Sequence, residues 1–332
     1  MAVISAVSLA MQGAHEAAAA TLPPVLFLMG PTASGKTALA VELVQRFPFE
    51  IISVDSAQVY RGMDIGTAKP DLETLRLAPH RLIDILDPGQ AYSVAQFRAD
   101  ALNAIEQIHA RGGIPLLAGG TMLYYRALQR GLSDLPPADP QVRARLEKEV
   151  ADRGVVALYA RLEKVDPVAA ARIHRHDTQR IQRALEVYEL SGQTMTELYA
   201  HGRNEMTAFR TLKLIVAPID RQVLHRRIEQ RFQHMLEQGF VAEVAGLRAR
   251  GDLNPKMPAM RAVGYRQLWD YLEGLTNYGG MMQRGVAATR QFAKRQLTWL
   301  RAEPDVVWLD SAMNGLLKQA IDCLRKVRFL PG

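Results

Sequence analysis

The chain has 332 residues, 48% hydrophobic and 23% charged, a composition that excludes disordered and collagen-like proteins and indicates a globular chain of one large domain or two. Cys323 is the only cysteine, which excludes a disulfide framework and a cysteine-rich zinc site and is typical of the cytoplasm. The net charge of +7 arises downstream, since residues 1–140 hold 10 Lys and Arg against 13 Asp and Glu, whereas residues 141–332 hold 31 against 21.

Residues 1–20 are apolar and rich in alanine, without the basic segment that begins a signal peptide. No run of about 18 uncharged apolar residues follows them, so no membrane span is predicted. We expect a loose N-terminal extension outside the fold.

Strands and helices alternate in the first part of the chain. The apolar runs typical of buried strands lie at residues 25–29, 50–54 and 114–118. Helical spacing at 37–47 predicts a helix after the first strand, and a capping box from Ser93 to Gln96 begins another that ends before Gly112. This α/β pattern predicts a parallel sheet flanked by helices on both faces, of the kind found in P-loop NTPases, with ligands at the carboxyl ends of the strands.

The alternation stops at the proline-rich segment 133–140, after which about 65 residues have helical character and no strand run. Strand signals return at 212–219 and 306–310, and Asp220 is expected to cap a helix that ends at Gly239. We therefore expect a core domain of residues 21–137 and 207–332, with an all-helical insertion domain of residues 138–206.

The sequence GPTASGKT follows the first strand and begins the first helix, as the phosphate-binding pattern G-x-x-x-x-G-K-[ST] requires. Backbone N–H groups and the helix N-terminus attract phosphate oxygens, Lys36 adds a cation, and the Thr37 hydroxyl can ligate Mg²⁺. We expect the diphosphate to contact Gly30, Pro31, Thr32, Ala33, Ser34, Gly35, Lys36 and Thr37.

Two further polar residues follow strands. Asp55 comes after the second strand, where it could accept a proton, order water around Mg²⁺ or cap a turn. Thr121 follows Gly119-Gly120, which is either a tight turn or a place of close ligand approach. These residues leave two enzymes open, a small-molecule kinase that transfers phosphoryl from ATP and a transferase for which diphosphate is the leaving group.

Longer motifs decide between these alternatives. Together with the phosphate loop they resemble the tRNA dimethylallyltransferases, also called tRNA isopentenyltransferases, in order and without a missing motif. They are VDSAQVYRGMDIGTAKP (54–70), GGTMLYYRAL (119–128), DTQRIQRALEVYELSG (177–192), RIEQRFQHMLEQGFVAEV (227–244), RAVGYRQLW (261–269) and TRQFAKRQLTWLR (289–301).

The resemblance implies Mg²⁺-dependent transfer of a dimethylallyl group from its diphosphate to N6 of the adenosine 3′ to the anticodon, in tRNAs that read codons beginning with U. It implies a cytoplasmic monomer. Asp55 is then the expected proton acceptor, Thr121 and Arg143 are expected at the reacting centre, and Arg231 is expected to bind the diphosphate donor. From its place in the helix QVRARLEKEV alone, Arg143 would be a solvated surface charge.

Downstream basic residues suit the backbone of tRNA, although a solvated helix face is the commoner explanation for each in an arbitrary protein. The amide of Gln58 suits an adenine edge. His174 and His176 have no cysteine partners, so we expect no zinc site. The resemblance implies tRNA contacts at Asp55, Ser56, Ala57, Gln58, Gln179, Arg180, Gln182, Arg183, Arg261, Gly264, Tyr265, Arg266, Lys294, Arg295, Gln296, Trp299 and Arg301.

Overall fold

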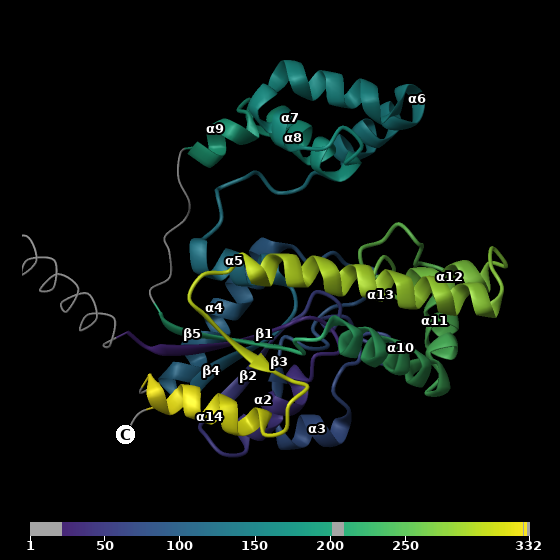
Figure 1. Ribbon diagram of the computed structural model, residues 1–332. Helices are drawn as coiled ribbons and strands as arrows, with labels where there is room; N and C mark the ends of the chain where they lie inside the picture. Colours follow the sequence, from purple (N-terminus) through teal and green to yellow (C-terminus); the bar gives the residue numbers. More distant parts are fainter. Residues whose placement is uncertain (1–21, 201–208, 328, 331–332) are drawn as a thin grey trace, which may run out of the picture. The chain divides into compact units, whose positions relative to one another are not determined.

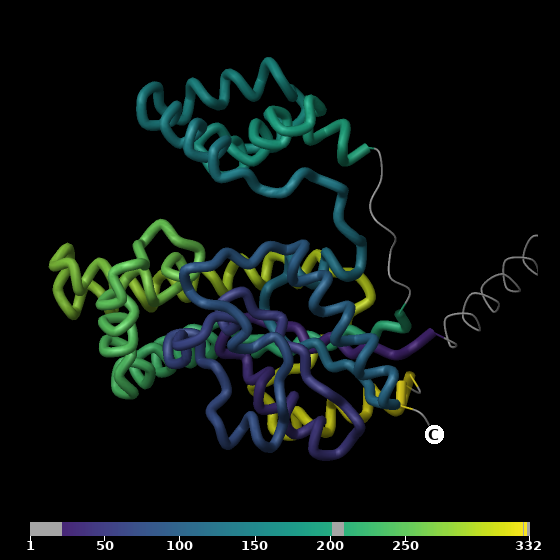
Figure 2. Tube along the Cα trace, turned by 180° about the vertical axis from the view of Figure 1, so that it is seen from behind, coloured from purple at the N-terminus to yellow at the C-terminus, as the bar shows by residue number. Residues whose placement is uncertain are grey.

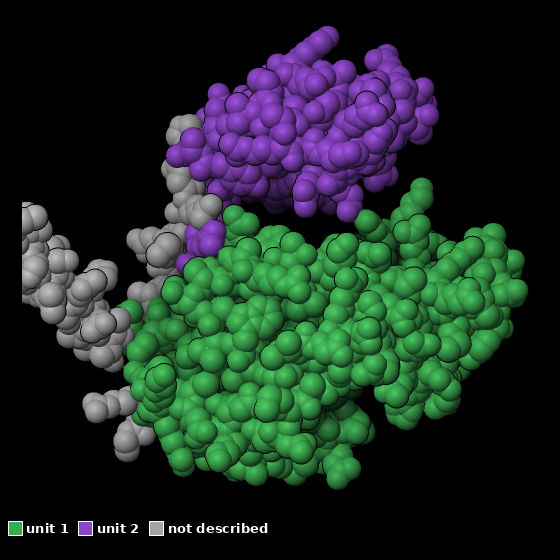
Figure 3. Space-filling model, viewed as in Figure 1, with its two compact units in different colours: residues 1–126, 208–332 green, residues 127–207 purple. Residues whose placement is uncertain are grey.

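The computed structural model describes residues 22–200, 209–327, 329 and 330 (Figure 1). The expected extension at 1–20 and the expected domain boundary at 206–207 lie outside these residues. The chain divides into two compact units, Met1–Arg126 with Ala208–Gly332 and Ala127–Thr207 (Figure 3). Each unit is described separately below.

The first unit contains a six-stranded sheet with the order β3-β2-β4-β1-β5-β6, in which all paired neighbours are parallel. The strands are β1 (Pro24–Met29), β2 (Phe49–Val54), β3 (His80–Arg81), β4 (Ile114–Gly119), β5 (Arg210–Ala217) and β6 (Val306–Asp310). The prediction of a parallel sheet is confirmed. Strand β3 was not predicted, because two residues carry no periodicity.

Helices cover both faces of this sheet (Figure 1). On one face, α2 (Lys36–Val44) and α14 (Leu316–Lys326) pack against alternate strand residues such as Leu26 and Leu28. On the other face, Phe27 contacts Tyr125 of α5 (Met122–Arg130) with ring centroids 4.9 Å apart. Side chains alternate between the faces of a strand, so each face of β1 contributes to a core of its own. Helix α4 (Val94–Ala110) begins at the predicted capping box, and a short helix, α3 (Leu72–Leu77), precedes β3.

A second apolar core lies among the helices labelled α10 to α13 in Figure 1, which Figure 2 shows from behind. These are α10 (Arg221–Glu237), α11 (Phe240–Ala249), α12 (Tyr265–Leu272) and α13 (Tyr278–Arg301). Asp220 caps α10 as predicted, since its carboxylate accepts a hydrogen bond from Gln222 N. Phe232 of α10 packs directly on Gly285 of α13, where a Cβ would lie 2.1 Å from the ring.

The second unit consists of α6 (Pro140–Val165), α7 (Pro167–Arg172), α8 (Thr178–Ser191) and α9 (Met195–Ala200), together with the last residues of α5. Leu146, Leu158, Leu162, Ile181 and Leu185 form its buried core. As expected from the sequence, no strand occurs among its described residues. Across the described parts of both units, none of the helices combines the length and apolarity that crossing a membrane requires.

Candidate active site

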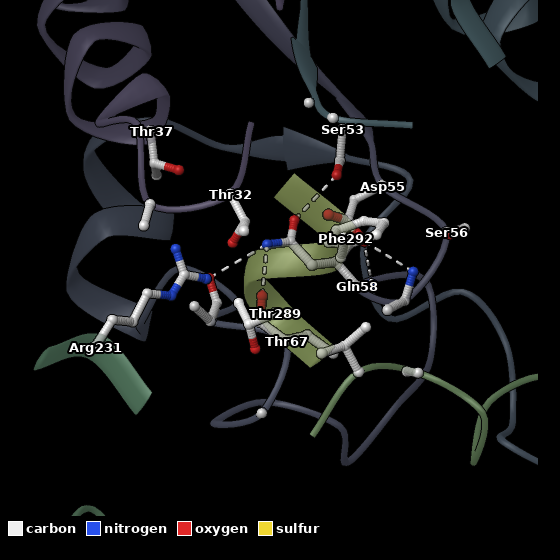
Figure 4. Close-up of a pocket in the computed structure, with 18 of the residues that line it drawn as sticks. Thr32, Thr37, Ser53, Asp55, Ser56, Gln58, Thr67, Arg231, Thr289 and Phe292 are labelled. Carbon is white, nitrogen blue, oxygen red and sulfur yellow. Dashed lines mark hydrogen bonds between the residues drawn. The ribbon is translucent and has the colours of Figure 1, made fainter. Parts of the chain in front are cut away.

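A cavity of about 390 Å³ lies in the first unit at the carboxyl ends of β1, β2 and β4 (Figure 4). Its wall includes Lys36 after β1, Asp55 after β2 and Gly119-Gly120 at the end of β4, while α10 and α13 close it from the side. In a parallel sheet, the carboxyl ends of neighbouring strands lie at one edge, which explains why residues far apart in sequence meet here.

The phosphate loop runs from β1 into α2 with two residues in the left-handed region, Ala33 at φ 60° and Gly35 at φ 95°. The Lys36 ammonium donates a hydrogen bond to the Pro31 carbonyl at 2.7 Å. Burial, followed by the nearby Arg231 guanidinium, lowers the pKa of Lys36 to about 7, while the Asp55 carboxylate acts in the opposite direction. The protein alone therefore does not supply enough negative charge around Lys36 to offset its burial and the repulsion by Arg231.

Positive charge dominates the cavity. Four cationic side chains line it, namely Lys36, Arg231, Arg261 and Arg295, and Asp55 is the one carboxylate among the lining residues that the structure describes. Arg231, on α10, forms no hydrogen bond or ion pair with any described residue, and burial lowers the pKa of its guanidinium. Four cations around one carboxylate suit a ligand with several negative charges, such as a diphosphate.

The two oxygens of the Asp55 carboxylate differ in their surroundings. Oδ1 accepts hydrogen bonds from Ala57 N at 2.8 Å and Gln58 N at 3.3 Å. Oδ2 accepts none from the described residues. One oxygen thus fixes the turn after β2, and the other is available to a ligand or a proton. Figure 4 shows Asp55 on one side of the pocket and Arg231 and Thr37 on the other.

Thr121 was expected beside the reacting centre. Its Oγ1 accepts a hydrogen bond from Ser56 N at 3.2 Å, and its own N–H donates to the Val54 carbonyl at 3.2 Å. It therefore ties the turn after β4 to the turn after β2, but it is not among the residues that line the cavity.

The Thr37 hydroxyl is available as a ligand for a magnesium ion in this site. Thr37 lines the cavity, and its side chain has no hydrogen-bond partner among the described residues. Those residues also contain no cluster of three or more His, Cys, Asp or Glu side chains able to hold a metal alone. This donor set fits Mg²⁺, which binds through one or two protein oxygens together with water and substrate phosphates.

Apolar side chains form another part of the wall. Ile228, Phe232 and Met235 lie at i, i+4 and i+7 on α10, and Phe292 of α13 joins them. Arg231 lies on the same helical side, three residues after Ile228, so one face of α10 presents both a cation and an apolar surface. The cavity can hold a small apolar group attached to a diphosphate.

Sequence comparison agrees with this chemistry. A family model described as IPP transferase matches residues 58–303, and a second one, described as isopentenyl transferase, matches residues 23–83. The first match spans more than half of the chain. The chain belongs to the IPP transferase family.

Relatives of this IPP transferase family member cover nearly its whole length. It is 61% identical to a tRNA dimethylallyltransferase of Alkalilimnicola ehrlichii over 93% of this chain and 96% of the relative. The crystal structure of a tRNA isopentenylpyrophosphate transferase from Bacillus halodurans is similar, with 37% identity, a TM-score of 0.67 and coverage of 93% and 97%. A eukaryotic dimethylallyltransferase acting on tRNA has 27% identity and a TM-score of 0.78, with coverage of 93% and 80%. None of these relatives is a kinase.

Gln58, predicted to meet an adenine edge, uses both ends of its amide within the protein (Figure 4). Its Oε1 accepts a hydrogen bond from Ser53 Oγ at 3.1 Å, and its Nε2 donates to the carbonyls of Thr67 and Ala68 at 3.4 and 3.2 Å. In this structure Gln58 shapes the cavity wall. Of its neighbours, Ala57 and Ser56 also line the cavity, and Ser56 is exposed.

Three of the expected tRNA contacts, Gly264, Tyr265 and Gln296, are buried in this structure, although Gln296 also lines the cavity. The Tyr265 hydroxyl donates a hydrogen bond to Glu243 Oε1 at 2.6 Å. The same carboxylate accepts hydrogen bonds from the backbone N–H groups of residues 64–66. Tyr265 therefore helps to hold the loop that forms one wall of the cavity. No sequence pattern singled out Glu243, which lies 22 residues from its tyrosine partner.

Of the other expected tRNA contacts of the first unit, Asp55, Ala57 and Gln58 are half-buried, and six residues besides Ser56 are exposed. Arg126 of α5 lies over the Trp299 ring, 5.7 Å from its centroid. Arg290 of α13 forms an ion pair with Glu229 of α10 at 2.8 Å. The exposed residues are Arg261, Arg266, Lys294, Arg295, Trp299 and Arg301.

The remaining candidates belong to the helical unit. Arg143 donates hydrogen bonds from Nε and Nη2 to the two oxygens of Glu186, at 2.8 and 3.3 Å. Arg183 donates to Glu186 Oε2 at 2.7 Å and to the Pro136 carbonyl at 2.7 Å. Arg143 is thus held by a buried carboxylate, while 51% of its own side chain stays exposed. Gln179 and Arg180 are exposed and Gln182 is half-buried.

Glu186 was missed by sequence reasoning, although its position three residues after Arg183 was a usable signal. His174 and His176 are both exposed, and the described residues around them form no metal cluster.

Proposed function

We propose that the chain transfers a dimethylallyl group from dimethylallyl diphosphate to N6 of the adenosine 3′ to the anticodon in tRNAs that read UNN codons, releasing diphosphate. The observation that carries the proposal is the cavity itself, where four cations surround one carboxylate beside an apolar wall. The named relatives, which act on tRNA, support the choice of acceptor.

On the donor side, the residues of the phosphate loop (Gly30, Pro31, Thr32, Ala33, Ser34, Gly35, Lys36 and Thr37) and Arg231 bind the diphosphate. Negative charge grows on the diphosphate as its bond to the allylic carbon breaks, and prearranged cations stabilise that charge. The Thr37 hydroxyl would be a ligand of bound Mg²⁺, which would supply further positive charge to the leaving group. The apolar face of α10 packs against the dimethylallyl chain and limits the access of water to it.

On the acceptor side, the adenine N6 amine is a weak nucleophile because its lone pair is delocalised into the ring. The N6–carbon bond forms as the carbon–oxygen bond breaks, and the amine must lose one proton. Asp55 Oδ2 accepts that proton, while Oδ1 keeps its hydrogen bonds to the turn. We assign Thr121 and Arg143 to the reacting centre, Thr121 through its bond to Ser56 N.

The target adenosine must leave its stack in the anticodon loop to be modified, which requires contacts to the RNA backbone around it. We assign this role to the exposed residues of the first unit and to Ser56, Ala57 and Gln58 in the cavity wall. In the helical unit, residues 138–206 would act as an insertion domain with Gln179, Arg180, Gln182 and Arg183 at the tRNA. The protein would work as a cytoplasmic monomer.

The deciding experiment incubates the protein with Mg²⁺, radiolabelled dimethylallyl diphosphate and unmodified tRNA. We expect label in the tRNA with the native chain and none with Asp55→Ala, although this variant still binds tRNA. Asp220→Ala is the matched control, because Asp220 also accepts a hydrogen bond from the N–H two residues on but lies outside the cavity. Phosphoryl transfer from ATP without prenyl transfer would overturn the proposal in favour of a kinase.

A further inference from the structure

Gln296 lies on α13 and connects two parts of the active site that are distant in sequence. Its Oε1 accepts a hydrogen bond from Thr32 N at 2.9 Å, in the phosphate loop. Its Nε2 donates to the Gly120 carbonyl at 2.9 Å, in the turn after β4. Gln296 is only 6% exposed, its bond to Gly120 is buried and its bond to Thr32 N is partly buried.

The surroundings leave little freedom at this junction. A Cβ on Gly120 would lie 2.2 Å from Gln296 Nε2, so the turn after β4 accommodates the amide only because residue 120 is glycine. The same Cβ would lie 3.2 Å from the Gly30 carbonyl, which places the start of the phosphate loop beside the turn. The loop, the turn and α13 therefore meet at one amide group.

We propose that Gln296 is a positioning residue that holds the phosphate loop in its diphosphate-binding conformation. The inference rests on the proposed function for the identity of the donor. A loop that binds through backbone N–H groups works best when its conformation is fixed before the ligand arrives, because ordering it on binding costs free energy. The Gln296 amide fixes the first half of the loop at Thr32.

The position of Gln296 on its helix separates this role from tRNA binding. Lys294, Arg295 and Trp299, on the same helix, are exposed, whereas Gln296 is buried against the loop. Loss of the amide should therefore weaken the binding of the diphosphate without weakening that of tRNA. A residue that only stabilised the core would instead leave both affinities unchanged.

The test compares Gln296→Met with Gln291→Met, an exposed position on the same helix whose substitution matches in size and chemistry. Calorimetric titration with inorganic pyrophosphate measures the loop directly and needs no transfer activity. Because Gln296→Met loses both hydrogen bonds, we expect it to raise the pyrophosphate Kd by about tenfold or more, while the tRNA Kd stays within about twofold. Gln291→Met should change neither.

Steady-state kinetics add a second readout, in which the KM for dimethylallyl diphosphate rises and the KM for tRNA does not. If Gln296→Met does not fold, Gln296→Glu serves instead, since its carboxylate still accepts from Thr32 N but cannot donate to Gly120. Because one of the two hydrogen bonds remains, a smaller rise in the pyrophosphate Kd is expected. An unchanged pyrophosphate Kd in a folded variant would overturn the inference. So would a raised tRNA Kd, which would make Gln296 a tRNA contact. Intact pyrophosphate binding without prenyl transfer in the native chain would count against the proposed function alone.

Discussion

The Arg231 guanidinium repels the Lys36 ammonium in the cavity. Burial is the larger cause and this repulsion the second cause that lowers the pKa of Lys36 to about 7. No described carboxylate forms an ion pair with either cation. The two cations repel each other in the free protein, and a bound diphosphate would offset this electrostatic repulsion with its negative charge.

Diphosphate binding should therefore take up a proton at pH 8. Lys36 is mostly neutral there in the free protein, and the anion favours its protonated form, so affinity should fall as the pH rises above about 7. Calorimetry of dimethylallyl diphosphate binding in two buffers with different ionisation enthalpies measures the proton uptake. The same measurement on Lys36→Met gives the proton changes of the ligand itself, which are subtracted. Equal proton uptake by the native chain and the variant would contradict the role assigned to Lys36.

Removing the Lys36 charge should stabilise the ligand-free protein. The pKa of Lys36 is lowered on folding from 10.5 to about 7, so the unfolded chain binds more protons between these pH values and stability rises with pH across that window. The gain in Lys36→Met should be greatest at pH 7 and below and disappear near pH 10.5. Each 1 kcal/mol corresponds to about 2–4 °C in Tm for a unit of this size. Thermal melts with exposed Lys318→Met as control measure the effect, and a lower Tm for Lys36→Met at pH 7 would contradict it.

Asp55→Asn isolates the proton-accepting oxygen from the turn. The asparagine carbonyl can still accept the hydrogen bonds from Ala57 N and Gln58 N, so tRNA binding should persist. Diphosphate should bind at least as tightly, because the carboxylate that faces the four cations is gone. The kcat should fall by about 10²–10⁴, the usual contribution of a general base. A kcat near that of the native chain, measured by single-turnover transfer, would exclude Asp55 as the proton acceptor.

Short sequence patterns predicted those parts of the site that are formed by residues close together in the chain. The phosphate loop, the turn at Asp55 and the end of β4 were visible because motif spacing and apolar runs extend over only a few residues. The partners that hold these parts were not. Gln296 lies 264 residues from Thr32, and in sequence it is a polar residue in a basic helix like any exposed one.

The same limit applies to the surroundings of Tyr265 and Arg143. Tyr265, which the resemblance places at the tRNA, is buried by tertiary packing. Arg143 meets Glu186 43 residues away, a contact that no helical spacing encodes. Side-chain burial depends on which helices pack together, and the sequence alone left that undetermined.

Tyr265→Phe should lower stability without changing the affinity for tRNA. The variant loses one hydrogen bond to the Glu243 carboxylate, which still accepts from three backbone N–H groups of the loop at 64–66. A lost bond to a charged group predicts about 1–3 kcal/mol less stability. Thermal melts and tRNA binding measured beside exposed Tyr278→Phe test this, and weaker tRNA binding with an unchanged Tm would restore Tyr265 as a tRNA contact.

Glu186 and Glu189 offer a matched pair for the role of Arg143. Both lie on α8, and each contacts two arginines, Glu186 with Arg143 and Arg183 and Glu189 with Arg145 and Arg161. The Glu186 side chain is 1% exposed and that of Glu189 is 19% exposed. Burial by itself would raise the pKa of Glu186, but the hydrogen bonds from the two arginines lower it below its ordinary value.

In Glu186→Gln, one oxygen is replaced by an NH₂ group that faces N–H donors, so Arg143 loses its fixed orientation. We expect kcat to fall about tenfold or more, with the KM for dimethylallyl diphosphate little changed. Glu189→Gln should keep kcat within about twofold, because its partners Arg145 and Arg161 are not assigned to the reacting centre. Because the pKa of Glu186 is lowered on folding, its contribution to stability is present near neutral pH and is lost as the pH falls through the folded-state value. The Tm difference between Glu186→Gln and the native chain should therefore shrink in acid. Equal kcat values for the two variants at pH 7 would remove Arg143 from the reacting centre.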